Sequence, residues 1–245
     1  MKNKLCPWAF GIVLIASLVG CTPGPGSSIS LTGSGNVITL EKDYTDFDGV
    51  AVSHSFKVDI RQGEAFSVVI RIDDNLEKYL EVIKEDGTLK IGFKPDRSYD
   101  IGEVTTEAAV TMPELTGVSL SFISHGTVTG FSSTQALDVN VSGVSSLSGD
   151  IEAGDASFNI SGGSQVTLNG SAEDVSINAS GSSELDLTMF PADDADVHTS
   201  GSSQVTVHAS GRLDAEVSGS SRIYYLGDPT LGRTHTSGSA SIERK

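Results

Sequence analysis

Three side chains that commonly bind metal ions recur at related positions in the second half of the chain: His198, Glu216 and His235. Each stands two residues before a Ser-Gly pair, and histidine nitrogens and carboxylates are suitable zinc ligands. If the three positions stack on neighbouring strands, about 4.8 Å apart, the two histidines are separated by about 9.6 Å. That distance is too long for one zinc ion unless the side chains converge. We interpret the column as solvent-facing and expect no metal.

Carboxylates offer two further possibilities. Asp193, Asp194 and Asp196 form an acidic group, and calcium binds clustered oxygen atoms, but the chain lacks the Gly-Asp period of calcium-loaded β-rolls. A solvated loop is the favoured interpretation. Glu184 and Asp186 alternate onto one face of a predicted strand, as the two acids of a glycosidase would. A Ser-His-Asp triad is not recognisable, because serine is abundant throughout the chain.

The N-terminus carries the clearest address signal. Two lysines precede an apolar run at 8–19, which is too short for a comfortable membrane span. The run ends in Leu-Val-Gly-Cys at 18–21, which resembles the bacterial lipobox, whose cysteine carries the lipid and begins the mature chain. We predict a signal peptide at 1–20, lipidation of Cys21 and a flexible tether at 21–28. The alternative is an ordinary secretory signal with an incidental cysteine.

Composition limits the possible partners and fold classes. The chain has 16 Lys and Arg against 32 Asp and Glu, a net charge of −16, and no basic stripe that would displace counterions from a phosphate backbone. Nucleic acid is therefore not an expected partner. Only 6% of the residues are aromatic and 27 are glycine, while serine, threonine and valine are frequent. This composition is typical of strands joined by tight turns and predicts an all-β protein.

A repeat of about 19 residues organises the second half. Hexapeptides such as SGSSQV recur, and their first serines are Ser142, Ser161, Ser180, Ser200, Ser218 and Ser237. A fixed period of this length is typical of a solenoid, and small residues favour a tight corner in each coil. Degenerate copies at Ser53 and Ser121 indicate that the first half contains the same unit.

Strand alternation assigns faces to each repeat. The residues one and three places before each serine are mostly apolar and are predicted to face inward, with a second inward column five places after it. The residues between the first two columns must face outward. Four of them are our predicted binding residues: Asn140, Asn159, Asn178 and His198.

The domain organisation follows from these patterns. Residues 29–103 are predicted to form a β-rich part with one short helix, capped by Asp74 and carrying Leu76 on its buried face. Residues 104–245 are predicted to form a short parallel β-helix of six or seven coils, on the order of 30 Å long.

The run FDGVAVSHSFKVDIRQGEAFSVVIRIDDNLEKYLEVIKEDGTLKIGFK, followed by the SGSS corners, resembles the GIN-domain family of auto-transporter adhesin head domains. The resemblance extends from about residue 37 to 242. It implies a β-helical fold on an exported bacterial lipoprotein with an adhesin-like role. It supplies no catalytic residues.

We therefore expect a non-enzymatic lipoprotein of the cell envelope, at the outer membrane or cell surface. It would be attached to the membrane by its N-terminal lipid and would bind an envelope protein or a glycan, without a cofactor. The alternative is a polysaccharide lyase or hydrolase, because such enzymes also use β-helices. The predicted mature chain has no tryptophan and no long inserted loop to form the wall of a cleft, which favours binding over catalysis.

Overall fold

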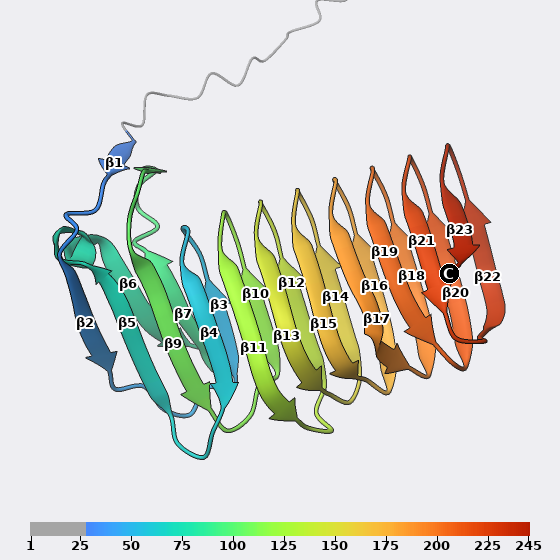
Figure 1. Cartoon of the computed structure of the whole chain (residues 1–245), viewed down its shortest axis with the longest axis horizontal. Coiled ribbons are helices and arrows are strands. Elements are labelled where there is room, and N and C mark those ends of the chain that lie inside the picture. Colours follow the sequence, from blue (N-terminus) through green and yellow to red (C-terminus); the bar gives the residue numbers. More distant parts are fainter. Residues whose placement is uncertain (1–27) are drawn as a thin grey trace, which may run out of the picture.

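The computed structural model describes residues 28–245, of which 61% lie in strands and 3% in one short helix. The strands form a ten-stranded sheet and an eleven-stranded sheet, which enclose one continuous hydrophobic core, and a separate pair of short strands (Figure 1). The predicted all-β class is confirmed. The predicted signal peptide, Cys21 and the tether up to residue 27 lie outside the described residues.

Seven coils, each with one strand in either sheet, build the solenoid. The ten-stranded sheet receives β10 (Gly117–Leu120), β12 (Leu137–Val141), β14 (Ala156–Ile160), β16 (Asp174–Ala179), β18 (Asp194–Thr199), β20 (Arg212–Val217) and β22 (Thr230–Thr236). The eleven-stranded sheet receives β11 (His125–Ser132), β13 (Ser146–Glu152), β15 (Gln165–Ser171), β17 (Glu184–Ala192), β19 (Gln204–Ala209), β21 (Arg222–Leu226) and β23 (Ser241–Arg244). Every neighbouring pair among these strands is parallel, which confirms the predicted β-helix.

One earlier coil begins the stack. It consists of β3 (Gly49–Val52) and β4 (Lys57–Gln62), which pair in parallel with β10 and β11, as the degenerate copy at Ser53 predicted. Between β4 and β10 the chain forms β5 (Ser67–Asp73), β6 (Leu80–Glu85), β7 (Thr88–Phe93), β8 (Tyr99–Ile101) and β9 (Thr106–Met112). Here β7 and β9 continue the parallel order, whereas β5, β6 and β2 (Val37–Lys42) are antiparallel and end the two sheets.

The short helix is present, but its predicted cap is wrong. It is a 3-10 helix, η1 (Asp74–Tyr79), and the residue at its N-cap is Asp73. The Asp73 side chain makes no capping hydrogen bond, because it is buried and accepts bonds from two backbone amides of neighbouring loops, at 2.8 and 2.7 Å. Leu76 is buried, as predicted.

The inward columns are confirmed through most of the stack. The column five places after the corner serine is buried at Leu147, Val166, Leu185, Val205 and Ile223. The prediction fails in the last coil, where Thr234 and Thr236 are exposed. The reason is that β22 is the edge strand of its sheet, so no further coil covers its inner face. Polar threonines at otherwise apolar positions are compatible with that exposure.

The corners that lead from the ten-stranded into the eleven-stranded sheet form one straight edge, at the top in Figure 1. We call it the Ser-Gly edge, comprising residues 53–56, 121–124, 142–145, 161–164, 180–183, 200–203, 218–221 and 237–240. The glycine that follows the first serine of a corner has positive φ, for example +77° at Gly162, where a Cβ atom would lie 2.3 Å from the carbonyl oxygen of Gly143 in the preceding coil. Only glycine allows both that conformation and that approach.

The opposite edge contains the returning turns, and carboxylates are concentrated there. We call it the acidic edge, comprising residues 152–155, 171–174, 192–194, 210–212 and 227–229. Its backbone is held by side chains as well as by main-chain bonds. The Asp174 carboxylate accepts a hydrogen bond from the amide of Asp194 at 3.0 Å, and the Asp194 carboxylate accepts one from the amide of Arg212 at 2.7 Å.

Candidate functional site

The four predicted binding residues lie side by side on the outer face of the ten-stranded sheet. Asn140, Asn159, Asn178 and His198 are paired in register on β12, β14, β16 and β18, and all are exposed. The Asn178 amide donates a hydrogen bond to the Asn159 carbonyl oxygen at 3.3 Å. We call these four residues the polar ladder. Parallel pairing brings them together because each occupies the same position in its repeat.

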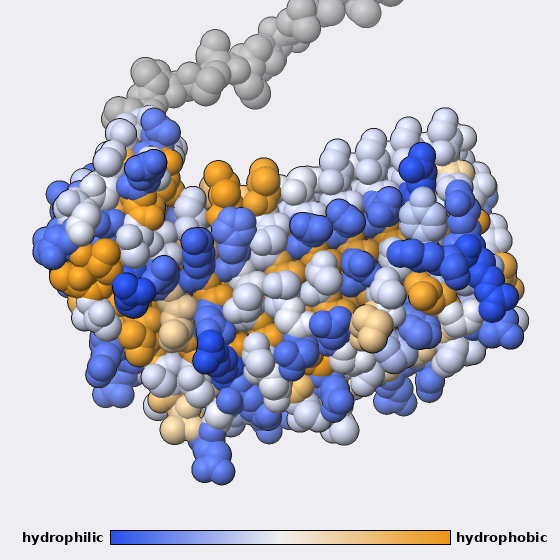
Figure 2. Space-filling model, in the orientation of Figure 1, coloured by the Kyte–Doolittle hydropathy of each residue, from blue (hydrophilic) through white to orange (hydrophobic). Residues whose placement is uncertain are grey.

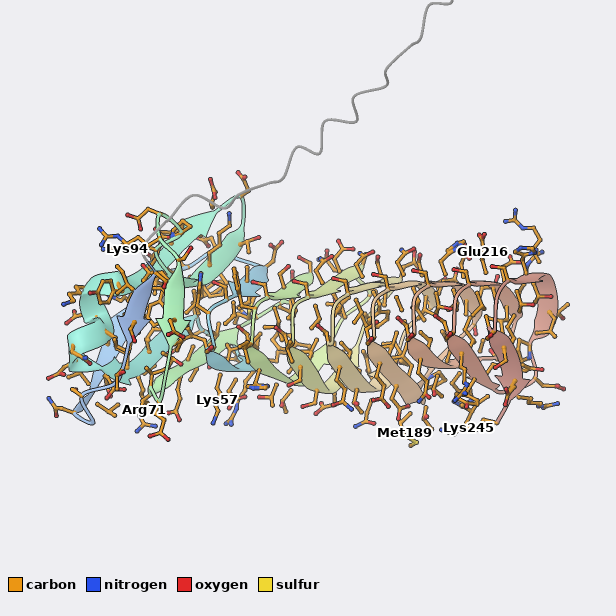
Figure 3. The ribbon with its side chains drawn as sticks, turned by 90° about the horizontal axis from the view of Figure 1, so that it is seen from above. Lys57, Arg71, Lys94, Met189, Glu216 and Lys245 are labelled. Carbon is orange, nitrogen blue, oxygen red and sulfur yellow. The ribbon has the colours of Figure 1, made fainter. Side chains whose placement is uncertain are left out.

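The ladder continues into the column that we considered for zinc. His198 pairs in register with Glu216, and Glu216 pairs with His235. The two ring nitrogens of His198 face carboxylates, Nδ1 at 3.3 Å from Glu216 and Nε2 at 3.2 Å from Asp196. Figure 3 shows Glu216 projecting from this face. Within residues 28–245, no group of three or more histidine, cysteine, aspartate or glutamate side chains is arranged to hold a metal ion.

The acidic group does not converge on a common point either. One carboxylate oxygen of Asp194 accepts a hydrogen bond from the backbone amide of Arg212 across the acidic edge. Asp193 receives main-chain bonds at its carbonyl oxygen from Ser210 and Gly211. Asp196 points outward from β18 beside His198. The three residues therefore stabilise the turn and line the sheet.

Glu184 and Asp186 share the outer face of β17, as predicted, but the chemistry of Asp186 does not suit a glycosidase acid. Partial burial acts to raise the pKa of Asp186, but hydrogen bonds from the Thr188 hydroxyl, at 2.5 Å, and from the Thr188 amide, at 2.9 Å, outweigh it. The resulting pKa lies below the usual value. A general acid needs a raised pKa, so this carboxylate is poorly suited to protonating a leaving group.

The eleven-stranded sheet carries a hollow of about 470 Å³ that the sequence did not predict. Val69 and Ala109 line it between the side chains of Lys57, Arg71 and His125. Lys57 and Arg71 project from the side of the solenoid opposite Glu216 in Figure 3. The sequence gives no signal for this hollow, because its walls come from β5, β9, β4, β11 and β13, and the antiparallel β5 lies outside the repeat.

The coils of the solenoid match a known protein family. The family model described as "putative auto-transporter adhesin, head GIN domain" matches residues 46–229, three quarters of the chain. The chain belongs to the GIN head-domain family. The predicted resemblance is thus confirmed over β3 to β21, which includes the complete polar ladder. No curated protein matches this GIN-domain sequence.

Solved structures share the fold of this GIN domain. A "putative adhesin" from Bacteroides fragilis is 19% identical with a TM-score of 0.78, covering 89% of this chain and 100% of that one. A "putative lipid binding protein" from Parabacteroides distasonis is 23% identical with a TM-score of 0.72, covering 88% and 99%. A "putative adhesin" from Parabacteroides merdae is 18% identical with a TM-score of 0.67, covering 89% and 100%. At these identities the likeness concerns the fold.

The adhesin description of the GIN family indicates a cell-surface or envelope location and a binding role. Across residues 28–245 there is no helix of the length and apolar character needed to span a bilayer.

Proposed function

We propose that this GIN-domain protein is a non-enzymatic lipoprotein of the cell envelope that binds a protein or a glycan through its polar ladder. A lipid on Cys21 holds it at the membrane. The observation that carries the binding role is the ladder itself, four exposed polar side chains in register on successive coils. Parallel stacking repeats these groups about every 4.8 Å, a spacing that suits an extended ligand with repeated polar groups.

The surface around the ladder favours a broad and shallow contact. Next to it, in the same strands, stand the outward hydroxyls of Ser157 and Ser176, and the hollow beside His198 is bounded by small residues of the Ser-Gly edge. No phenylalanine, tyrosine or tryptophan occurs among the residues that bound that hollow. Specific ligand pockets usually enclose their ligand among apolar and aromatic groups, whereas the exposed side chains beside His198 are polar. We expect weak individual contacts that add up along the ladder.

Anchoring is tested by replacing the proposed lipid attachment site. The Cys21→Ala chain should leave the membrane fraction, whereas the unchanged chain should remain there and incorporate labelled fatty acid. Retention of Cys21→Ala in the membrane with unchanged labelling would exclude this site of attachment.

Binding is tested with the full chain on arrays of glycans and of envelope proteins. Combining Asn159→Ala, Asn178→Ala and His198→Ala should weaken capture at least about tenfold if each group contributes an ordinary hydrogen bond. The matched control combines Gln165→Ala, Glu184→Ala and Gln204→Ala, which alters the same three coils on the opposite sheet.

Three outcomes separate the possibilities. Loss of capture in the ladder variant alone supports the proposal. Loss in the control alone moves the site to the eleven-stranded sheet. Cleavage of a polysaccharide that disappears in Glu184→Gln or Asp186→Asn, with folding unchanged, would establish the lyase or hydrolase alternative.

A further inference from the structure

Three large apolar side chains protrude from the Ser-Gly edge. Phe122, Ile123 and Val144 are 59%, 54% and 61% exposed, and they occupy two successive corners. The carbonyl oxygen of Phe122 accepts the amide of Val144 at 2.7 Å, so the two corners are in direct contact. Figure 2 shows hydrophobic atoms at the tips of the β10–β11 and β12–β13 corners, beside the paler small residues of the later corners. We call these three residues the apolar patch.

Phe122, in the apolar patch, combines an exposed ring with a backbone conformation that is unfavourable for phenylalanine. Phe122 has φ +64°, the left-handed conformation that glycine occupies in the following corners, for example at Gly143 with φ +78°. A phenylalanine is disfavoured there, and its ring is exposed apart from stacking on His54 at 4.5 Å between centroids. A strained residue that buries little of its side chain is more readily explained by a contact outside the chain than by stability.

The charge of the edge restricts what that contact can be. The eight corners of the Ser-Gly edge contain no aspartate, glutamate, lysine or arginine, in a chain with net charge −16. His54 is their one titratable residue, and burial lowers its pKa, which favours the neutral ring at neutral pH. The acidic edge, in contrast, carries Glu152, Asp155, Glu173, Asp174, Asp193, Asp194 and Asp228. Of the two edges, the Ser-Gly edge is the one whose corners can approach lipid phosphates without repulsion between like charges.

The described chain also begins at this edge. Strand β1 (Ile29–Leu31) pairs with β8, with Ile29 opposite Tyr99. The Tyr99 ring is 5.8 Å from the His54 ring, and His54 stacks on Phe122, so neighbouring aromatic rings connect the start of β1 to the apolar patch. Figure 1 shows β1 above the same edge as the corners. Cys21 precedes Ile29 by eight residues, which reach at most about 28 Å when fully extended.

We propose that the Ser-Gly edge faces the lipid bilayer and that the apolar patch enters its interface. The proposal rests on the proposed lipidation of Cys21, which would hold the start of β1 close to the membrane. Apolar and aromatic side chains bind favourably at the boundary between headgroups and acyl chains, and a second membrane contact strengthens attachment by a lipid. The solenoid axis then runs along the membrane. Both sheet faces, including the polar ladder, are then perpendicular to the membrane plane, and the acidic edge faces away from the membrane.

The experiment uses the mature chain, which begins at lipidated Cys21, reconstituted in phosphatidylcholine vesicles that contain lipids brominated on their acyl chains, which quench nearby tryptophan. Ile123→Trp places the probe in the patch. Gln135→Trp places it on an exposed turn at the opposite end of the coil, as the matched control. The mature chain has no tryptophan of its own, because Trp8 lies in the predicted signal peptide, so the introduced tryptophan is the only one in each sample. Vesicle flotation is measured on the same samples.

We expect both variants to float with the vesicles and Ile123→Trp to be quenched at least about twofold more than Gln135→Trp. Flotation with equal quenching would overturn the orientation and leave the anchoring intact. Failure to float would overturn the anchoring and, with it, this proposal. A blue-shifted Ile123→Trp emission without quenching by brominated lipid would show that a protein, such as a second copy of the chain, covers the patch instead.

Discussion

The two edges of the solenoid turn the same chain by different means. At the Ser-Gly edge each coil bends through backbone that nearly touches the preceding coil, as in the 2.7 Å hydrogen bond from the amide of Gly163 to the carbonyl oxygen of Gly143. At the acidic edge main-chain bonds of the same length, such as the 2.7 Å bond from the amide of Gly211 to the carbonyl oxygen of Asp193, are supplemented by carboxylates such as Asp194 that bond to the backbone of the next turn. The Ser-Gly edge therefore uses the same small residues in nearly every coil, whereas the acidic edge adds side-chain bonds to a less uniform sequence.

The irregularity of the repeat lies away from the Ser-Gly edge. Successive corner serines are 18 to 20 residues apart, as between Ser180 and Ser200 and between Ser200 and Ser218. The corners nonetheless stay in register, because the pairing of β17 with β19 shifts between Asp186 and Pro191, after the corner and toward the acidic edge. The Ser-Gly edge is thus the fixed reference of each coil, and length differences are absorbed on the way to the other edge.

The largest expected effect concerns the close contact between corners. Gly162→Ala combines a positive φ with a Cβ atom 2.3 Å from the carbonyl oxygen of Gly143, so the free energy of unfolding should fall by about 3 kcal/mol or more. Urea unfolding measures the change. Gly163→Ala, in the same corner, lacks the positive φ and has its nearest atom at 3.9 Å, so it should change stability little.

A second control separates strain from contact. Gly35 has φ +79°, but no atom lies within 4 Å of the place that a Cβ atom would occupy, so Gly35→Ala should cost only about 1 kcal/mol. Equal losses for Gly162→Ala and Gly35→Ala would mean that contact between coils does not restrict the corner.

A smaller effect is expected at the buried serine that ends six of the eight corners. The Ser183 hydroxyl is within hydrogen-bond distance of the Ser180 carbonyl oxygen, at 3.1 Å, and of the Ser203 hydroxyl, at 3.2 Å. Ser183→Ala should lower the free energy of unfolding by about 1.5 kcal/mol, whereas the exposed neighbour Ser182→Ala should leave it nearly unchanged. Calorimetry compares the two, and the reverse order would show that the corner is held by its exposed hydroxyls.

A gain of stability is expected beside the same edge. The hydroxyl of Thr199 is buried and has no hydrogen-bond partner among the described residues. Thr199→Val keeps the shape and removes the unpaired group, so the free energy of unfolding should rise by about 1 kcal/mol. Urea unfolding checks this value, and a loss of stability instead would mean that the hydroxyl has a partner in solution.

The smallest effect concerns acid sensitivity next to the acidic edge. The guanidinium of Arg212 and the amide of Arg233 bond to the Asp214 carboxylate and lower its pKa. A carboxylate with a lowered folded pKa stabilises the fold above its unfolded pKa, about 3.8, and that contribution is lost as the pH falls through the folded value.

Asp214→Asn should therefore reduce stability at pH 7 and weaken the acid dependence of the melting temperature below about pH 4. Ser220→Ala, on the Ser-Gly edge, replaces a residue that does not titrate and should leave the acid dependence unchanged. A steeper fall in acid for Asp214→Asn would contradict the sign of the pKa shift.

The sequence predicted the parts of the molecule that obey one local rule in every coil. The period of the corner serines indicated the solenoid, and alternation placed Leu185 inside and Asn178 outside. Alternation alone could not place strands outside the repeat. The hollow between Val69 and Ala109 depends on antiparallel pairing of β5 with β9, which are separated by β6, β7 and β8 in the sequence.

The roles of two individual residues, Phe122 and Asp73, could not be predicted from the sequence either. Phe122 occupies a position where later coils have glycine, and only the structure shows that its ring is exposed at the edge where the described chain begins. Asp73 resembles a helix cap by position, but its carboxylate bonds to the loops around it. Both cases depend on long-range contacts that a local pattern does not contain.

Hydrogen–deuterium exchange tests the contrast between the two edges most directly, because one measurement reports on both. It compares the vesicle-bound full chain with the Cys21→Ala chain in solution. We predict that membrane attachment slows exchange at least about tenfold in the corners 121–124 and 142–145 and leaves the turns 152–155 and 171–174 unchanged. Slower exchange at the acidic turns, or equal protection of both edges, would contradict a bilayer-facing Ser-Gly edge.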